Sequence, residues 1–239
     1  MDCERMKLRG VVRLWTPHSL AAIVVSRFSL ALWLAAGCSG QLLAQGPGVY
    51  PINMKASQIA IHVYKSGFLS GLGDNHQIAL THFSGFAELS KTQPWQAQVT
   101  AEAGSLKVLD PWASASQRRE VQDTMLGPRQ LDVSHFPLIT LRSLTFAPTG
   151  KDTIWRLKAN LTLHGVTRPV EFSLACRQTG DSLRVQGKKM LRLRDFGIEP
   201  ISRALGAVRV KNEFEITYDV DLQFKGSSQR LGCSVGALR

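Results

Sequence analysis

Residues 153–178 read TIWRLKANLTLHGVTRPVEFSLACRQ, and apolar and polar side chains alternate through most of this stretch. Alternation with a period of two is typical of β-strands, because successive side chains point to opposite faces of a sheet. Gly165 divides the stretch into two runs and permits a tight turn between them. The stretch therefore predicts a hairpin of two long strands.

The same alternation continues outward in both directions from this hairpin. It recurs in residues 57–65, 78–82, 95–106, 138–146, 182–197 and 212–226. Glycine, proline and aspartate separate the runs, as is typical of turns. About eight long strands without alternating helices must stack as two sheets or close on themselves, so we expect an all-β fold.

One segment, residues 114–127, has a helical pattern instead. Val121 and Met125 are four residues apart and share a face with Gln122 near them. Ser114 or Ser116 is expected to cap the start of this helix, and Gly127 to end it. We therefore expect one short helical insertion in the β fold.

The composition indicates one globular domain with an additional segment. The chain has 239 residues and a formal net charge of +11, from 29 Lys and Arg against 18 Asp and Glu. The basic residues are spread along the predicted strands, whereas nucleic-acid recognition needs clustered basic residues with exposed aromatic ones. We expect no nucleic-acid partner.

The first 44 residues have the layout of a secretory signal. A basic stretch precedes the apolar run FSLALWLAA at residues 28–36, and a small and polar segment follows it. Cleavage after Ala44 would release a periplasmic or secreted protein. The alternative is LAAGC at residues 34–38, which resembles the lipobox of bacterial lipoproteins and would anchor the chain through a lipid on Cys38.

The sequence holds no pattern of residues that indicates catalysis. It contains no GxSxG elbow and no HExxH helix, and the glycine-rich residues 71–75 lie between predicted strands. We therefore expect no enzyme, no catalytic residue and no cofactor. The histidines are dispersed, so no metal site is expected, and His76 is expected to bond backbone groups of its loop. Whether Cys176 and Cys233 form a disulfide stays open.

Several segments carry a resemblance to a known family. Asp123 and Leu126 precede the run DVSHFPLITLRS at residues 132–143, LTLHGVTRPV follows at 161–170, and RLRDFG at 192–197. In order and spacing these segments resemble the YceI-like family. The resemblance implies an extended, lipocalin-like antiparallel β-barrel of about eight strands, with an apolar interior that holds a long-chain isoprenoid or similar amphiphile.

His164 and Arg168 belong to the second of these segments, and two interpretations of them stay open. They are either determinants of the hairpin or polar groups near a barrel mouth that meet a ligand's head group. Arg129 and Asp132 could pair across the loop before Phe136, but a solvated pair of this kind would contribute only a few tenths of a kcal/mol.

The period of two predicts which side chains face the interior. We expect the lipid-binding lining to include Phe83, Phe86, Phe146, Trp155, Leu161, Phe172, Leu174, Phe214, Ile216 and Tyr218. A slip of one residue in a strand would turn all its side chains to the other face.

The prediction as a whole is an exported binding protein. Residues 1–44 form the signal, 45–226 the lipid-binding barrel and 227–239 a C-terminal tail. The bound partner is a long-chain isoprenoid or similar amphiphile, held for transport, storage or protection. A homodimer and peripheral membrane association stay open, and the alternative function is a non-catalytic interaction domain with a filled core.

Overall fold

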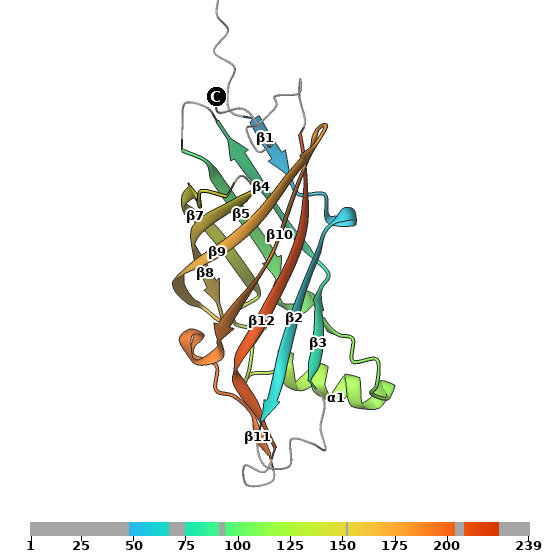
Figure 1. Ribbon diagram of the computed structural model, residues 1–239. Helices are drawn as coiled ribbons and strands as arrows, with labels where there is room; N and C mark the ends of the chain where they lie inside the picture. Colours follow the sequence, from blue (N-terminus) through green and yellow to red (C-terminus); the bar gives the residue numbers. More distant parts are fainter. Residues whose placement is uncertain (1–47, 67–74, 91–93, 152, 204–207, 225–239) are drawn as a thin grey trace, which may run out of the picture. The chain divides into compact units, whose positions relative to one another are not determined.

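The computed structural model describes residues 48–66, 75–90, 94–151, 153–203 and 208–224 (Figure 1). The predicted signal at 1–44, with Cys38 and Ala44, lies outside the described residues, as does the tail at 227–239 with Cys233. Export, lipid anchoring and the disulfide therefore stay predictions.

The described residues form one curled antiparallel sheet of twelve strands. The strands are β1 (Gly48–Pro51), β2 (Gln58–Ser66), β3 (His76–Leu80), β4 (Phe83–Leu89), β5 (Gln96–Glu102), β6 (Leu106–Val108), β7 (Leu138–Pro148), β8 (Ile154–Leu163), β9 (Val166–Thr179), β10 (Ser182–Arg192), β11 (Ser202–Arg203) and β12 (Val208–Gln223). They pair in the order β1-β4-β5-β7-β8-β9-β10-β12-β2-β3-β6, and β11 pairs with β12 beside this path.

The predicted all-β, antiparallel, barrel-like fold is confirmed, but the expected number of about eight strands is wrong. The additional strands are β1, β4, β6 and β11. Three of them have four residues or fewer, and Gly85 interrupts the alternation of β4. Such short or interrupted runs have too few side chains to show a period of two.

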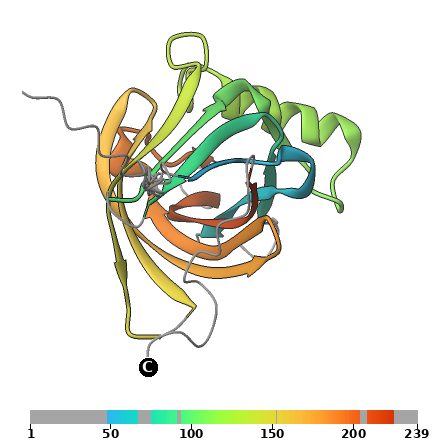
Figure 2. The same cartoon turned by 90° about the horizontal axis from the view of Figure 1, so that it is seen from above.

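The curled sheet closes through a bend in one strand. β5 continues through the 3-10 helix η3 (Ala103–Ser105) into β6. β5 pairs with β4 and β7, whereas β6 pairs with β3. The chain thereby joins β6, the last strand of the pairing order, to β5, the third strand of that order. The strands consequently surround an interior, as the view along the sheet axis shows (Figure 2).

β1 and β4 lie beyond this junction and reach across to β12. Ile52, directly after β1, forms an isolated bridge with Leu222. The backbone N–H of Asn53 donates to the carbonyl oxygen of Asp221 at 2.8 Å. This end of the curled sheet is therefore also tied together.

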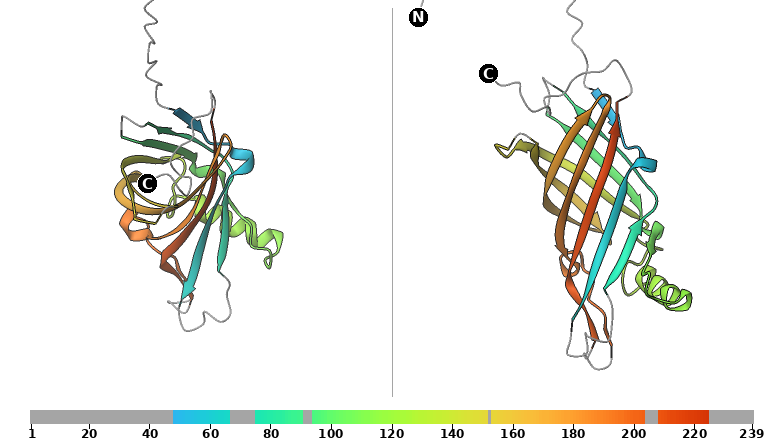
Figure 3. Two further views of the ribbon diagram at one scale, coloured as in Figure 1. Left: turned by 45° about the horizontal axis from the view of Figure 1, so that its top comes forward. Right: turned by 45° about the vertical axis from the view of Figure 1, so that its right-hand side comes forward.

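The predicted helix is confirmed as α1 (Ala115–Leu126), and it covers the outer edge of β6 (Figure 3). Ser114 accepts a hydrogen bond from the Gln117 backbone, and Gln117 completes a capping box. The side chain of Gln122 accepts from the Val108 N–H at 2.8 Å and donates to the Leu106 carbonyl at 2.6 Å. Gln122 therefore bonds strand-edge groups that an adjacent strand would otherwise pair.

The β8–β9 hairpin turns through only two residues, His164 and Gly165. Their φ values are +50° and +70°, so both residues lie in the left-handed region that a tight hairpin turn requires. The ring of Phe136 packs on this turn, edge-to-face with His164 at a centroid distance of 4.6 Å. A side chain at Gly165 would bring its Cβ within 2.5 Å of this ring.

The Gly165 turn gives a stability prediction with a matched control. Gly165→Ala should lower the free energy of unfolding by at least about 2 kcal/mol, from left-handed strain and the collision with Phe136. Gly150 also has a positive φ, +81°, but nothing lies within 4 Å of a Cβ there. Gly150→Ala should therefore lower the free energy of unfolding by only about 1 kcal/mol. Urea unfolding of both variants measures the difference. Equal losses would show that Phe136 does not constrain the turn.

Candidate functional site

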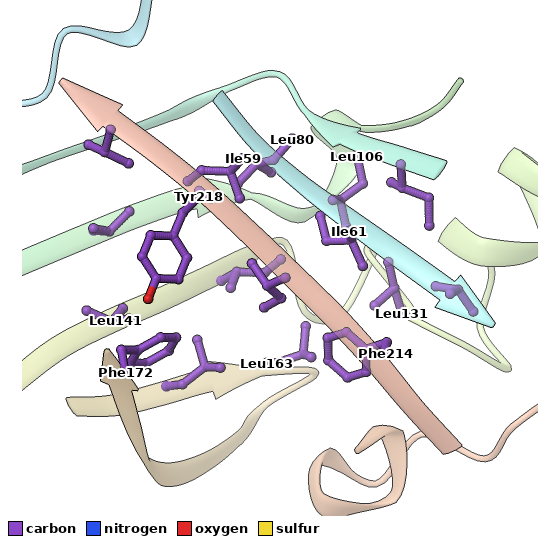
Figure 4. Close-up of a pocket in the computed structure, with 18 of the residues that line it drawn as sticks. Ile59, Ile61, Leu80, Leu106, Leu131, Leu141, Leu163, Phe172, Phe214 and Tyr218 are labelled. Atoms are coloured by element: carbon purple, nitrogen blue, oxygen red, sulfur yellow. The ribbon is translucent and has the colours of Figure 1, made fainter. Parts of the chain in front are cut away.

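The interior of the sheet holds an elongated cavity of about 750 Å³ (Figure 4). Side chains from β2 to β10, from β12 and from α1 line it. Most of them are aliphatic or aromatic, including Ile59, Ile61, Leu80, Leu106, Leu131, Leu141 and Leu163. A volume of this size is within the range of about 300–1,000 Å³ that is typical of pockets for small ligands.

Nine of the ten side chains expected to face the interior line this cavity. They are Phe86, Phe146, Trp155, Leu161, Phe172, Leu174, Phe214, Ile216 and Tyr218. Phe83 does not line the cavity, although it is buried. Phe83 is the first residue of β4, and the part of β4 that lines the cavity begins at Phe86. Whether the nine side chains contact a lipid stays a proposal.

Sequence reasoning missed many lining residues. Ile59, Ile61 and Val63 of β2 alternate in a run that was recognised as a strand, so that signal was available. Leu141 and Phe146 of β7 both line the cavity although their spacing is odd. A β-bulge between Ser143 and Thr145 shifts the register and changes the phase. Such a shift is not visible in the alternation alone.

The two ends of the cavity differ in exposure. At one end Trp95 stacks on Trp155 at 4.4 Å and lies edge-on to Phe146 at 6.0 Å. The Trp95 indole N–H donates to the Ser90 carbonyl at 2.9 Å, so this apolar group of rings has its polar atom bonded. None of these lining side chains is in the exposed class. This end, here called the tryptophan end, is therefore less exposed than the other.

The other end adjoins α1 and reaches solvent. Its lining includes Trp112, Gln117, Glu120 and Arg209, all exposed. Val220 lies eleven positions after Arg209 on β12 and is level with Val185 of the apolar end. That is a strand length of roughly 35 Å. The cavity is thus long, with exposed lining side chains at the open end beside α1 and less exposed ones at the tryptophan end.

His76 and Asp110 meet at the open end. The Nδ1 atom of His76 lies 2.7 Å from Oδ2 of Asp110, and Asp110 Oδ1 accepts from the Gln77 N–H at 2.8 Å. Asp110 is only 1% exposed. The expectation that His76 bonds backbone groups of its loop is therefore wrong. Its partner lies 34 residues further along the chain, and the β3–β6 pairing brings the two together.

The side chain of Tyr218 extends from β12 past Gly187 of β10 to Ser173 of β9, at the point where the pairing of β9 with β10 ends. Pairing between β9 and β10 runs as far as Ala175 and Gln186. Next to this point the Tyr218 hydroxyl donates to the Ser173 carbonyl at 2.7 Å. Gly187 leaves space for it, since a Cβ there would lie 2.4 Å from the hydroxyl. Burial raises the pKa of Tyr218 to about 12.

The polar residues of the motif segments hold turns and do not line the cavity. The Arg168 Nε–H donates to the Asp195 carbonyl at 2.9 Å, and His164 Nδ1 lies 3.3 Å from the Phe196 carbonyl. The Asp132 carboxylate contacts Ser134 and His135, and Arg129 is not among its partners. The hydrogen bond from His135 lowers the pKa of Asp132. These contacts favour the structural interpretation of His164 and Arg168.

The described residues contain neither a metal-binding cluster nor a membrane-spanning helix. No group of three His, Cys, Asp or Glu side chains within them could hold a metal ion. Within the same ranges no helix is long and apolar enough to cross a membrane.

The buried phenol gives a pH prediction. Ultraviolet difference titration of the wild type against Tyr218→Phe should show ionisation near pH 12. An ordinary tyrosine ionises at about pH 10. Because the folded state holds this proton more tightly than the unfolded chain, stability should fall as the pH rises from about 10 to about 12. The Phe variant should lack this component of the fall. A difference titration with its midpoint near pH 10 would contradict the buried position.

The comparisons with known proteins agree with this architecture. The model of the family described as YceI-like domain matches residues 50–222. The crystal structure of Burkholderia cenocepacia BcnA has a TM-score of 0.58 at 17% identity and covers 71% of this chain and 98% of its own. A mutant YceI protein of Campylobacter jejuni, with a monobromobimane guest, has a TM-score of 0.50 at 9% identity and covers 63% of this chain and 85% of its own.

At such low identity these structures show the fold alone. A search of the curated proteins finds no match. The family model, by contrast, matches more than half of the chain, from β1 to the end of β12. The protein therefore belongs to the YceI-like family.

Proposed function

We propose that this protein binds a long-chain isoprenoid or similar amphiphile in the interior of its sheet. The observation that carries the proposal is the elongated apolar cavity of about 750 Å³, with its exposed and charged lining at the end beside α1. A single-chain amphiphile matches this shape, because its tail fits a narrow apolar channel and its head group can stay near solvent.

The energetics of such a complex follow from burial. Each methylene group that leaves water contributes about 0.8 kcal/mol, so several isoprene units together can exceed the entropic cost of fixing the chain. The lining offers aliphatic and aromatic side chains along the whole channel. The membership in the YceI-like family supports the proposal, since its members are known as lipid- and polyisoprenoid-binding barrels.

The alternative function, an interaction domain with a filled core, has less support. A filled barrel would have its lining side chains in mutual contact, with no continuous channel between them. The proposed role is therefore binding without catalysis, for transport, storage or protection of the ligand. We also propose export to the periplasm or beyond on the leader at 1–44, with lipidation of Cys38 as the alternative outcome.

The proposal predicts a co-purifying lipid. Mass spectrometry of an organic extract from natively purified protein should detect a polyprenyl-type species at near-stoichiometric amount. An unrelated protein prepared in parallel from the same cells is the control. An extract that matches the control, together with no binding of added prenyl lipid, would reject the proposal.

A second prediction concerns the direction of the side chains. Phe214 and Glu213 are neighbours on β12, but Phe214 lines the cavity whereas Glu213 pairs with Arg192 on the outer surface. Phe214→Lys should weaken binding of a prenyl lipid at least about tenfold, because it places a charge in an apolar channel. Glu213→Lys should change the affinity by no more than about twofold, since the surface pair is solvated.

A matched pair on another strand repeats the comparison. Phe172 of β9 lines the cavity, and its neighbour Glu171 pairs with Arg156 outside. Circular dichroism should verify that each variant is folded before binding is compared. If the inner and outer variants of both pairs bind equally well, the ligand does not occupy this cavity.

A further inference from the structure

The pairing of β9 with β10 covers only part of the two strands. It ends at Ala175 and Gln186, although both strands continue, β9 along β8 and β10 along β12. No backbone hydrogen bond joins residues 166–174 of β9 to residues 187–192 of β10, and the structure describes both stretches in full. The space between these two stretches is here called the seam.

Side-chain hydrogen bonds cross the seam near both of its ends. Where the pairing ends, the Tyr218 hydroxyl donates to the Ser173 carbonyl at 2.7 Å, and the Tyr218 ring extends toward Phe172 (Figure 4). At the other end the Arg168 Nε–H donates at 2.9 Å to the carbonyl of Asp195, in the 3-10 helix η4 (Leu193–Phe196). Parting the strands here breaks side-chain bonds such as these, but it breaks no ladder of backbone bonds.

Two cationic side chains show that the wall is open at the seam. Lys189 opposes Ile216 and Arg168 opposes Leu161, and both of these partners line the cavity. Directly opposed residues have their side chains on the same face of a sheet, so Lys189 and Arg168 belong to the inner face. Both nevertheless line a surface groove together with exposed residues of the outer face. A side chain of the inner face reaches such a groove only where no backbone closes the space between the strands.

One cluster of apolar side chains separates this groove from the cavity. Its members on the groove side are Val170, Leu191 and Phe196, and its members on the cavity side are Leu161, Leu163 and Phe214. At the seam the partition between the outer surface and the interior therefore consists of side chains without a paired backbone.

From these observations we propose that the seam is a lateral portal, through which an apolar ligand enters and leaves the cavity. The inference rests on the proposed function and adds the route of exchange. The seam lies beside the part of β12 that lines the cavity with Phe214 and Ile216, which oppose Leu191 and Lys189. A long chain that passes sideways through the seam crosses one cluster of side chains, whereas a chain that enters beside α1 has to thread the channel from its end.

The rate of exchange tests the portal. The probe is N-phenyl-1-naphthylamine, a dye whose fluorescence rises in apolar surroundings, mixed with delipidated full-length protein in a stopped-flow instrument. Geranylgeraniol should displace the dye if both occupy the cavity. Arg168→Met should raise the rates of dye entry and release at least about threefold, because a bond across the seam is lost. The dissociation constant should change less than about twofold, since Arg168 does not line the cavity.

Arg184→Met is the matched control. Arg184 also joins neighbouring strands, by its pair with Asp219, but it does so where the backbone pairing of β10 with β12 is continuous. This variant should keep both rates within about twofold of the wild type. Equal rates in the two arginine variants would overturn the portal.

A cross-link gives the opposite test. An extension of the β9–β10 register would place Glu171 opposite Met190, and both are exposed. In Glu171→Cys/Met190→Cys, a short bismaleimide that joins the two thiols should slow dye entry and release at least about tenfold, because the strands can no longer part. Mass spectrometry verifies the cross-link.

The control for the cross-link joins two strands that are already paired. Lys188→Cys/Thr217→Cys links β10 to β12 at an opposed pair of the register and should leave the rates unchanged. Both double variants are made with serine in place of Cys3, Cys38 and Cys233, whereas Cys176 is buried and is kept. Unchanged rates with the seam cross-linked would mean that the ligand passes through the open end and would overturn the portal.

The outcomes separate the two proposals. Wild-type protein that binds the dye and geranylgeraniol, with exchange rates that neither the Arg168 variant nor the seam cross-link alters, would overturn the portal and leave lipid binding intact. Failure of the wild type to bind either compound would reject the proposed function itself.

Discussion

The continuity of β5 into β6 is the constraint on which the hollow interior depends. A sheet edge exposes backbone N–H and carbonyl groups, and these are satisfied by another strand, by side chains or by water. Here the bend at η3 lets one chain segment pair with β4 and β7 before the bend and with β3 after it. Gln122 of α1 then bonds the other edge of β6. The result is a curved wall whose apolar face has no second sheet to pack against.

A wall of this kind has an energetic consequence for its apolar face. The side chains of two stacked sheets fill the space between them, but a long curled sheet leaves its centre without packing partners. The aromatic rings at the tryptophan end fill part of this space, and the clusters around Leu157 and around Phe196 fill more of it. What remains is a channel whose lining gains contacts when an apolar chain enters. Occupancy would therefore stabilise the fold by mass action.

Local periodicity was enough to predict the long strands, the helix and most of the candidate lining, because these features depend on neighbours in sequence. Features set by distant neighbours were not predictable in this way. The bulge in β7 depends on its pairing with β8, and the contact of His76 with Asp110 depends on the β3–β6 pairing. Phe83 follows the inward period of β4, but it lies beyond the stretch of that strand that lines the cavity.

The polar residues that carry the family resemblance lie outside the channel, whereas Leu161 and Leu163 of the same segments line it. Asp132, His164, Gly165 and Arg168 hold turns and the junction near Phe196 outside the channel. Lys65 lies at the open end and belongs to none of the segments that carry the resemblance. The backbone positions that Gly165 and Phe136 impose can thus be kept while the charges at the open end vary. The lining of the channel is apolar over most of its length, and its exposed and charged side chains gather at the end beside α1.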